Sequence, residues 1–310
     1  MPASPPPSLV PMKIKPHLAG ILLMLGGMLL FTLNDALGKW LVADYPVGQI
    51  LAVRSVAALL ILLPYLWCQG LLAGLLRIEQ PGLQTLRVAL VVAEVALFYL
   101  AVRHLPLADV FMFYLASPIF VTLLSVIFLG ERVGPARWVA VAVGFAGVVL
   151  IFPPSSAALT LPALMALAGS FSLALMMILA RRLRASSGFH LITLQTSGVA
   201  LAGAATLPLS WVSPTPLAFG LICLLGVVAT TAHFMLNHAV KLAPANVVAP
   251  FQYTAIVWAM ALGYLVWGDV PTPAAMGGAA LIVGAGLAIF FHENRAQKLA
   301  ELTEKVVSEV

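Results

Sequence analysis

Residues 101–136 read AVRHLPLADVFMFYLASPIFVTLLSVIFLGERVGPA, and residues 239–274 read AVKLAPANVVAPFQYTAIVWAMALGYLVWGDVPTPA. Aligned without a gap so that Ala101 falls on Ala239, both begin with Ala-Val and a basic residue, and both continue to a proline, a Gly-acid pair and a Pro-Ala pair. Any one match is weak in such apolar sequence, but charged, proline and glycine landmarks in the same order are difficult to obtain by chance. The chain is therefore predicted to consist of two related halves.

The whole chain has the composition of a membrane protein. Of its 310 residues, 62% are hydrophobic and only 9% are charged, and the mean hydropathy is +1.06. Soluble globular proteins contain about 25% charged residues and about 45–50% apolar ones. The composition thus excludes a soluble enzyme, a nucleic-acid-binding protein and a disordered chain. The net charge of +5 comes from scattered basic residues, which in a membrane protein indicate topology.

Hydropathy predicts an all-α membrane protein with ten transmembrane helices. A helix that crosses a bilayer needs about 20 apolar residues, and the apolar segments are too long and too even for the strands of a β-barrel. Charges, prolines and polar turns divide the chain into ten such segments, at 18–41, 47–68, 83–103, 106–129, 135–152, 160–180, 189–210, 215–238, 243–266 and 272–291.

The domain organisation follows from the repeat and the spans. We expect a first five-helix repeat at 17–152 and a second at 153–291, between a disordered cytoplasmic tail at 1–16 and a cytoplasmic tail at 292–310. Because each repeat has an odd number of helices, the second enters the membrane from the opposite side. Such inverted repeats occur in many transporters, whose substrate site lies near the midplane between the repeats.

The basic residues place both termini in the cytoplasm. With a cytoplasmic N-terminus, only Lys39 and Arg103 fall at outer helix ends, and Arg54 falls within a helix. The other basic residues fall on the cytoplasmic side: Lys13, Lys15, Arg77, Arg87, Arg132, Arg137, Arg181, Arg182, Arg184, Lys241, Arg295, Lys298 and Lys305. This excess of basic residues on one side supports ten spans with both termini in the cytoplasm.

The landmarks of the two halves resemble those of a known family. They are Asn34-Asp35, Lys39, Pro46, Gln49, Arg54, Ser117-Pro118, Leu129-Gly130-Glu131-Arg132, Gly144 and Gly147 in the first half, and Pro244, Trp267-Gly268-Asp269, Gly284 and Gly286 in the second. Over about residues 18–291 the pattern resembles the EamA-type permeases of the drug/metabolite transporter superfamily. The resemblance implies an inner-membrane permease, often an exporter, with a central cavity between its repeats and a substrate among amino acids, metabolites and drugs. The second half departs from the first at Asp269, where the first half has Glu131, and it lacks the basic residue that follows.

Three ionisable residues fall near the outer ends of the first two helices. Asp35 and Arg54 each lie about seven residues inside their helices, which is about 10 Å deep at a rise of about 1.5 Å per residue. Asp35, Lys39 and Arg54 could neutralise one another, through an Asp35–Arg54 pair between helices and an i,i+4 pair of Asp35 with Lys39. Alternatively, Asp35 or Arg54 contacts a charged substrate. An alignment that places Lys39 on Arg181 puts Met177 opposite this aspartate, so the repeat does not require a carboxylate there, which favours a function for it.

Glu94 is the deepest acidic residue, about twelve residues from the start of the third predicted helix. It has no basic partner at i±3 or i±4, and a carboxyl group in that position suits proton binding and release. The alternative is a protonated side chain that hydrogen-bonds to a neighbouring helix. In the ungapped alignment of the two halves, Glu94 falls on Ala232, beside His233. His233 is the second candidate for a proton relay, or else a hydrogen-bond donor between helices.

Several weaker candidates for the substrate pathway are polar or aromatic. They are Tyr99, Tyr114, Gln195, Gln252, Tyr253 and Trp258. Each could instead pack between helices with one hydrogen bond. Pro118 and Pro250 are expected to kink the fourth and ninth helices, which would expose main-chain carbonyl groups to a cavity.

The predicted function is secondary transport of a small metabolite, an amino acid or a drug by alternating access, with export favoured and proton coupling left open. No P-loop is present for self-contained use of ATP. The alternative is an intramembrane enzyme or lipid-substrate protein without a recognised catalytic motif, since the chain has no His-Glu-x-x-His and no Gly-x-Ser-x-Gly. We expect no catalytic residue, no metal ligand and no cofactor. The expected partners are a small-molecule substrate and the lipid bilayer, without nucleic acid, and homodimerisation is left open.

Overall fold

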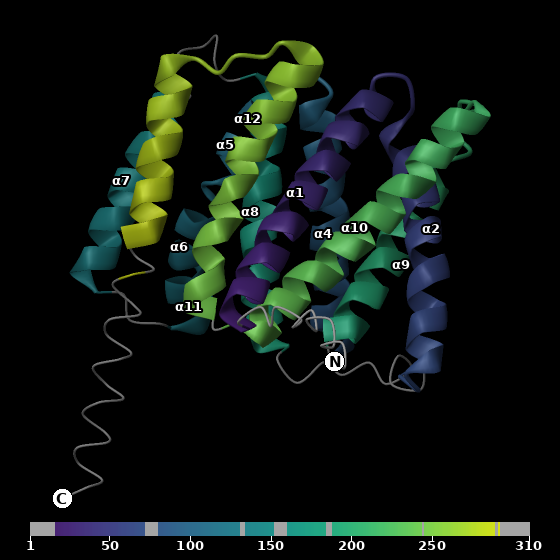
Figure 1. Ribbon diagram of the computed structural model, residues 1–310, viewed down its shortest axis with the longest axis horizontal. Helices are drawn as coiled ribbons and strands as arrows, with labels where there is room; N and C mark the ends of the chain where they lie inside the picture. Colours follow the sequence, from purple (N-terminus) through teal and green to yellow (C-terminus); the bar gives the residue numbers. More distant parts are fainter. Residues whose placement is uncertain are drawn as a thin grey trace, which may run out of the picture.

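A computed structural model describes residues 16–71, 80–130, 134–151, 160–183, 188–243, 245–288 and 291, and these residues form helices and connections without a strand. The elements, labelled in Figure 1, are α1 (Pro16–Val42), α2 (Val47–Cys68), α4 (Pro81–Val102), α5 (Leu107–Tyr114), α6 (Ser117–Leu129), α7 (Pro135–Ile151), α8 (Leu161–Arg182), α9 (Gly188–Thr206), α10 (Pro216–Leu242), α11 (Ala245–Val248), η1 (Ala249–Tyr253) and α12 (Thr254–Trp267). A further apolar helix, Pro273–Ala288, follows them. The tails, as well as Glu131 and Arg132, lie outside the described residues.

Six of the helices are long and apolar enough to cross a membrane. They are Leu18–Val42, Val47–Cys68, Pro81–Val102, Leu107–Leu129, Leu161–Ala180 and Pro216–Leu242. Three shorter apolar helices in the described part of the chain are Trp138–Leu150, Leu191–Thr206 and Pro273–Ala288. The protein is therefore an all-helical, multi-pass membrane protein.

Prolines and glycines set several helix ends. The helices α4, α6, α8 and α10 each have a proline in the first two positions, where the missing N–H group costs no intrahelical hydrogen bond. At the other end, Gly130 follows α6 with φ 65° and Gly268 follows α12 with φ 72°. Glycine adopts this left-handed conformation without the steric penalty of a Cβ atom. The two glycines are landmarks of the sequence repeat, so the two halves end these helices in the same way.

Two of the predicted spans are interrupted near their middle. The segment predicted at 106–129 consists of α5 and α6, with a break before Ser117-Pro118. The segment predicted at 243–266 consists of α11, the 3₁₀ turn η1 that contains Pro250, and α12. A proline in a helix interior loses a hydrogen bond and collides with the preceding turn, so each segment begins a new helix there. The expectation of kinks at Pro118 and Pro250 agrees with these breaks.

The helices pack in pairs that join the two halves of the chain. α1 runs along α10, α2 along α9, and α4 along α8. α7 and the helix Pro273–Ala288, drawn in yellow, lie together at one edge of the bundle, and α2 lies toward the opposite edge (Figure 1). Between these edges, α1, α4, α8 and α10 surround the centre of the molecule.

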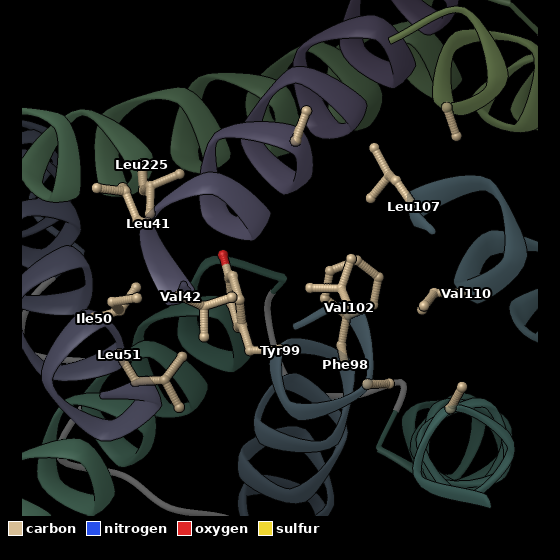
Figure 2. Packing of buried hydrophobic residues seen from close by; sticks show 14 of the residues in the cluster. Leu41, Val42, Ile50, Leu51, Phe98, Tyr99, Val102, Leu107, Val110 and Leu225 are labelled. Atoms are coloured by element: carbon tan, nitrogen blue, oxygen red, sulfur yellow. The ribbon is translucent and has the colours of Figure 1, made fainter. Parts of the chain in front are cut away.

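One end of the bundle is closed by buried apolar side chains, which we name the helix-end cluster. Its members come from the last turns of α1 and α4 and the first turns of α2, α5 and α10: Leu41, Val42, Ile50, Leu51, Val102, Leu107, Ile222 and Leu225. Each is at most 3% exposed. Figure 2 shows Leu41, Val42, Ile50 and Leu51 to the left of Tyr99, with Val102 beside Phe98 and Leu107 to its right. Because successive helices run in opposite directions, these helix ends meet on one side, and packed apolar side chains fill the bundle there.

Candidate functional site

A cavity of about 330 Å³ lies in the middle of the bundle, on the inner side of the helix-end cluster. Side chains of α1, α2, α4, α5, α8, α9 and α10 line it. Seven of the ten candidates for the substrate pathway line this cavity together: Asp35, Arg54, Glu94, Tyr99, Tyr114, Gln195 and His233. The structure thus brings together the ionisable residues that the sequence places deepest in the membrane.

Arg54 lies at the end of the cavity that is next to the helix-end cluster. Its Nη1 atom donates a hydrogen bond of 2.6 Å to the hydroxyl oxygen of Tyr99, and its guanidinium carbon lies 5.5 Å from the centre of the Tyr99 ring. Tyr99 is only 1% exposed, so its position is fixed by packing. Asp35 and Glu94 line the same cavity as Arg54. The guanidinium group is therefore a fixed positive charge that faces two carboxyl groups across the cavity.

The charged residues of α1 have different partners from those predicted. Lys39 forms an ion pair with Asp269, with 3.3 Å between Nζ and Oδ2, and its Nζ lies 4.6 Å from the centre of the Trp267 ring. Asp35 accepts a hydrogen bond of 3.1 Å from Nδ2 of Asn34. The predicted Asp35–Lys39 pair is therefore wrong, and Arg54 bonds Tyr99 in place of the predicted ion pair with Asp35. The long side chain of Lys39 reaches the turn after α12, where a carboxylate and an aromatic face meet it.

Glu94 and His233 face the same cavity from α4 and α10. The hydroxyl group of Tyr114 lies 3.4 Å from the main-chain oxygen of Glu94. Nδ1 of His233 is 2.8 Å from the main-chain oxygen of Ala229. A proton on Nδ1 makes this contact a hydrogen bond and leaves Nε2 as the acceptor of a neutral imidazole. The ring of Phe31 meets His233 edge to face at 4.7 Å, so the imidazole is held in one orientation.

An aromatic wall completes the cavity. Phe98 stands edge to face against Tyr99, Phe111 and Tyr114, with ring centres 5.7, 6.1 and 5.5 Å away. These edge-to-face contacts are the preferred arrangement of aromatic pairs. The cavity therefore has an aromatic wall beside its ionisable groups.

Three predicted residues lie outside this cavity. Gln252 and Tyr253 line a second cavity of about 390 Å³, between the interrupted segments α5–α6 and η1–α12. Trp258 lines neither cavity, and its Nε1 atom is buried without a hydrogen-bond partner in the described structure. Tyr114 lines both cavities.

The sequence missed several polar residues of the main cavity. Asn34, Ser55, Thr196 and Thr230 line it beside the ionisable groups. Each lies next to a recognised candidate or one turn from it, as Thr230 does from His233. A helical spacing of three or four residues from each buried charge could have identified Thr230. No such spacing identifies Ser55. It directly follows Arg54, and adjacent residues on a helix point in different directions.

Removing the Tyr99 hydroxyl group tests whether it positions Arg54. We expect Tyr99→Phe to raise the KM for a charged solute about tenfold, since a hydrogen bond to a charged group contributes about 1.5–3 kcal/mol. Initial rates of solute uptake into proteoliposomes measure the effect. Tyr264→Phe is the matched control, because Tyr264 is 62% exposed. Equal KM values for the two variants would contradict a positioning role for Tyr99.

Long apolar helices that enclose a cavity with a few ionisable groups at mid-depth define the class of multi-pass membrane transport proteins. The EamA-like transporter family model matches the chain twice, over residues 18–152 and 160–291. The chain belongs to this family. Its membership decides against the alternative of an intramembrane enzyme.

The named relatives are transporters, and each aligns with this chain over nearly its whole length. The chain is 30% identical to the pseudopaline exporter CntI of Pseudomonas aeruginosa over 276 residues, which cover 87% of this chain and 95% of that protein. It is 30% identical to the riboflavin transporter of Rhizobium johnstonii, over 90% of this chain and 93% of the relative. It is 23% identical to the S-adenosylmethionine uptake transporter of Rickettsia felis, over 91% and 96%. A solved crystal structure shares the fold, with a TM-score of 0.64, 18% identity and coverage of 89% of this chain and 97% of that one.

Proposed function

We propose that this protein is a secondary transporter that moves a small charged metabolite across a bacterial inner membrane by alternating access, coupled to protons. The observation that carries the proposal is the mid-depth cavity that joins Arg54, Asp35, Glu94 and His233. An ionisable group costs several kcal/mol inside a membrane, and a cluster of them around a cavity is retained where a solute must be bound. The named transporter relatives support the same function.

The ten spans and the inverted repeats, at 17–152 and 153–291, are part of this proposal. Helix contacts follow the two-fold relation that inverted repeats require. The pairing of the first span with the eighth (α1 with α10) has its counterpart in that of the sixth with the third (α8 with α4). The pairing of α6 with α8 likewise corresponds to that of α12 with α1. These matched contacts support a pseudo-two-fold axis through the cavity.

The difference between the two ends of the bundle supports alternating access. With both termini in the cytoplasm, the helix-end cluster faces the outside and closes the cavity in that direction. In the ungapped alignment of the two halves, Val102 of this cluster corresponds to Val240 on the cytoplasmic side. Val102 is 0% exposed, whereas Val240 is 49% exposed. Other equivalent positions, such as Val110 and Val248, are buried in both halves. The proposal is therefore that transport opens the helix-end cluster and closes the opposite end of the cavity in turn.

The lining of the cavity favours a solute with an anionic group and an apolar or aromatic part. The guanidinium group of Arg54 is suited to a carboxylate or phosphate, which it can bind with two parallel hydrogen bonds. Asp35 and Glu94 suit an ammonium group or a proton. The ring of Phe98 and its aromatic neighbours offer a surface for a flat apolar group.

Flux into proteoliposomes tests the proposed function. Purified protein is reconstituted, and uptake is measured for riboflavin, S-adenosylmethionine, pseudopaline and the amino acids, with protein-free liposomes as the control. We expect saturable uptake of at least one solute that is stimulated by an imposed pH gradient. No uptake of any solute above the protein-free control, with full incorporation of folded protein, would overturn the proposal.

Glu94→Gln tests the proton coupling. We expect the variant to lose stimulation by the pH gradient but to retain exchange of unlabelled for labelled solute, because glutamine keeps the shape of the side chain and cannot release a proton. Uptake with and without the gradient, compared at the same protein density, gives the ratio. Asp44→Asn is the control, since Asp44 is an exposed carboxylate between α1 and α2. A pH-gradient stimulation in Glu94→Gln equal to that of the wild type would exclude Glu94 as the coupling group.

A further inference from the structure

Arg87 differs from the other cytoplasmic-side arginine and lysine residues of the described structure. The sequence assigns it to topology, but its side chain is only 7% exposed. Arg182 and Lys241 on the same side are exposed, as expected for charges that only orient the protein. A buried arginine in a membrane helix is costly, so topology does not account for its position.

The partners of Arg87 among the described residues are neutral. Nη2 donates a hydrogen bond of 3.0 Å to Oε1 of Gln195, and Nη1 donates one of 3.4 Å to the main-chain oxygen of Leu191. The Nε atom is buried and has no hydrogen-bond partner in the described structure. Among the described residues, no carboxylate forms an ion pair with this guanidinium group. Breaking or omitting the partner of a buried charge costs several kcal/mol, so the site is poised to accept an anion.

Arg87 lies at the end of the cavity that is opposite to the helix-end cluster. It precedes Val91 by one turn and Glu94 by two turns of α4, and both of those residues line the cavity. Its partner Gln195 also lines the cavity, from α9. α4 runs from Arg87 toward Tyr99, beside Arg54. Arg87 thus lies just beyond the lining of the cavity and is connected to it through Gln195, whereas Arg54 lines the cavity near its other end.

We propose that Arg87 and Gln195 form a second anion subsite of the transport pathway, which takes a carboxylate or similar anionic group of the solute on the cytoplasmic side. When no anion is bound, the amide oxygen of Gln195 accepts a hydrogen bond from the guanidinium group. A carboxylate that replaces the amide oxygen gains a charge-assisted, bidentate pair, and the amide can then donate to it. The role of this subsite in transport rests on the proposed function, whereas its chemistry is open to a binding measurement alone.

Binding of benzoate, with neutral benzamide as the matched ligand, tests the subsite without knowledge of the solute. Calorimetric titration is made on the purified full-length protein and on Arg54→Gln, Arg87→Gln and Arg182→Gln. We expect Arg87→Gln in the Arg54→Gln background to bind benzoate at least about tenfold more weakly than Arg54→Gln alone, and benzamide to bind none of them. Arg182→Gln should bind benzoate as the wild type does, because Arg182 is exposed. Equal benzoate affinities with and without Arg87, or no benzoate binding by the wild type, would overturn the proposal.

Gln195→Glu separates an anion subsite from a purely structural link between α4 and α9. The new carboxylate would pair with the guanidinium group and strengthen the link, yet it would compete with an anionic ligand. We expect the variant to be at least as thermally stable as the wild type but to bind benzoate about tenfold more weakly. Higher stability with unchanged benzoate binding would make Arg87 a structural residue. If Gln195→Glu loses benzoate binding but the wild-type protein transports no solute, the anion subsite is supported and only the transport function is rejected.

Discussion

Arg54→Gln is expected to lower the transport of an anionic solute about a hundredfold, measured as kcat/KM in proteoliposomes. The guanidinium group is the positive charge next to the closed end of the cavity, and Tyr99 holds it in place through a hydrogen bond of 2.6 Å. A charge-assisted hydrogen bond contributes about 1.5–3 kcal/mol, and every 1.36 kcal/mol is about tenfold in an equilibrium constant. Loss of both hydrogen bonds of a bidentate pair therefore reaches about a hundredfold. Glutamine also leaves Asp35 and Glu94 facing the cavity without the nearby charge.

Two further variants separate the effect of the positive charge on transport from that of the paired N–H donors of the guanidinium group. Arg54→Lys keeps the charge but lacks the planar pair of donors, so it should recover only part of the activity. Arg103→Gln is the control for a general loss of positive charge, because Arg103 is exposed at the end of α4. An Arg54→Gln protein that transports the anionic solute at the wild-type rate would show that Arg54 neutralises its neighbours only.

Much of the fold could be predicted because a membrane leaves few alternatives. The bilayer requires backbone hydrogen bonds to be made within helices, so segment length and hydropathy alone indicated α1, α2, α4, α8 and α10. The interruptions at Ser117 and in the η1 turn were harder to predict. A proline permits a kink or a complete break, and the packing of neighbouring helices selects between the two outcomes. Those contacts come from segments far away in the sequence.

The sequence indicates which residues lie inside the apolar helices, but it does not give the directions in which their side chains point. Their positions within apolar helices made Asp35, Arg54 and Glu94 candidates, and in the structure the three line one cavity. Depth does not tell how a helix is rotated about its axis, and rotation selects the partners. Lys39 thus pairs with Asp269, 230 residues away, although Asp35 is its neighbour on the helix. The burial of Arg87 could not be predicted for the same reason, because a basic residue near a helix end has the same sequence signal whether its side chain is exposed or buried.

Gly226→Ala is expected to destabilise the protein by about 2–3 kcal/mol, the upper part of the range for overpacking. Gly226 lies on α10, where the α2 backbone comes close. A Cβ atom at position 226 would overlap the main-chain oxygen of Arg54 and lie 2.9 Å from the main-chain nitrogen of Ala58. Backbone atoms cannot turn aside as the end of a side chain can, so the two helices must separate. Close approach of this kind supplies the dispersion energy that holds membrane helices together.

Gly220→Ala in the same helix is the matched control, because a Cβ atom there has nothing within 4 Å. Alanine has a higher helix propensity than glycine by about 1 kcal/mol, so this variant should be as stable as the wild type or slightly more stable. Thermal unfolding in detergent compares the two variants. Since the separation displaces the backbone of Arg54 itself, we also expect Gly226→Ala to reduce transport at temperatures at which it is still folded, whereas Gly220→Ala does not. Equal unfolding temperatures would mean that the two helices move apart at little cost, which is the behaviour of a sliding interface rather than a fixed one.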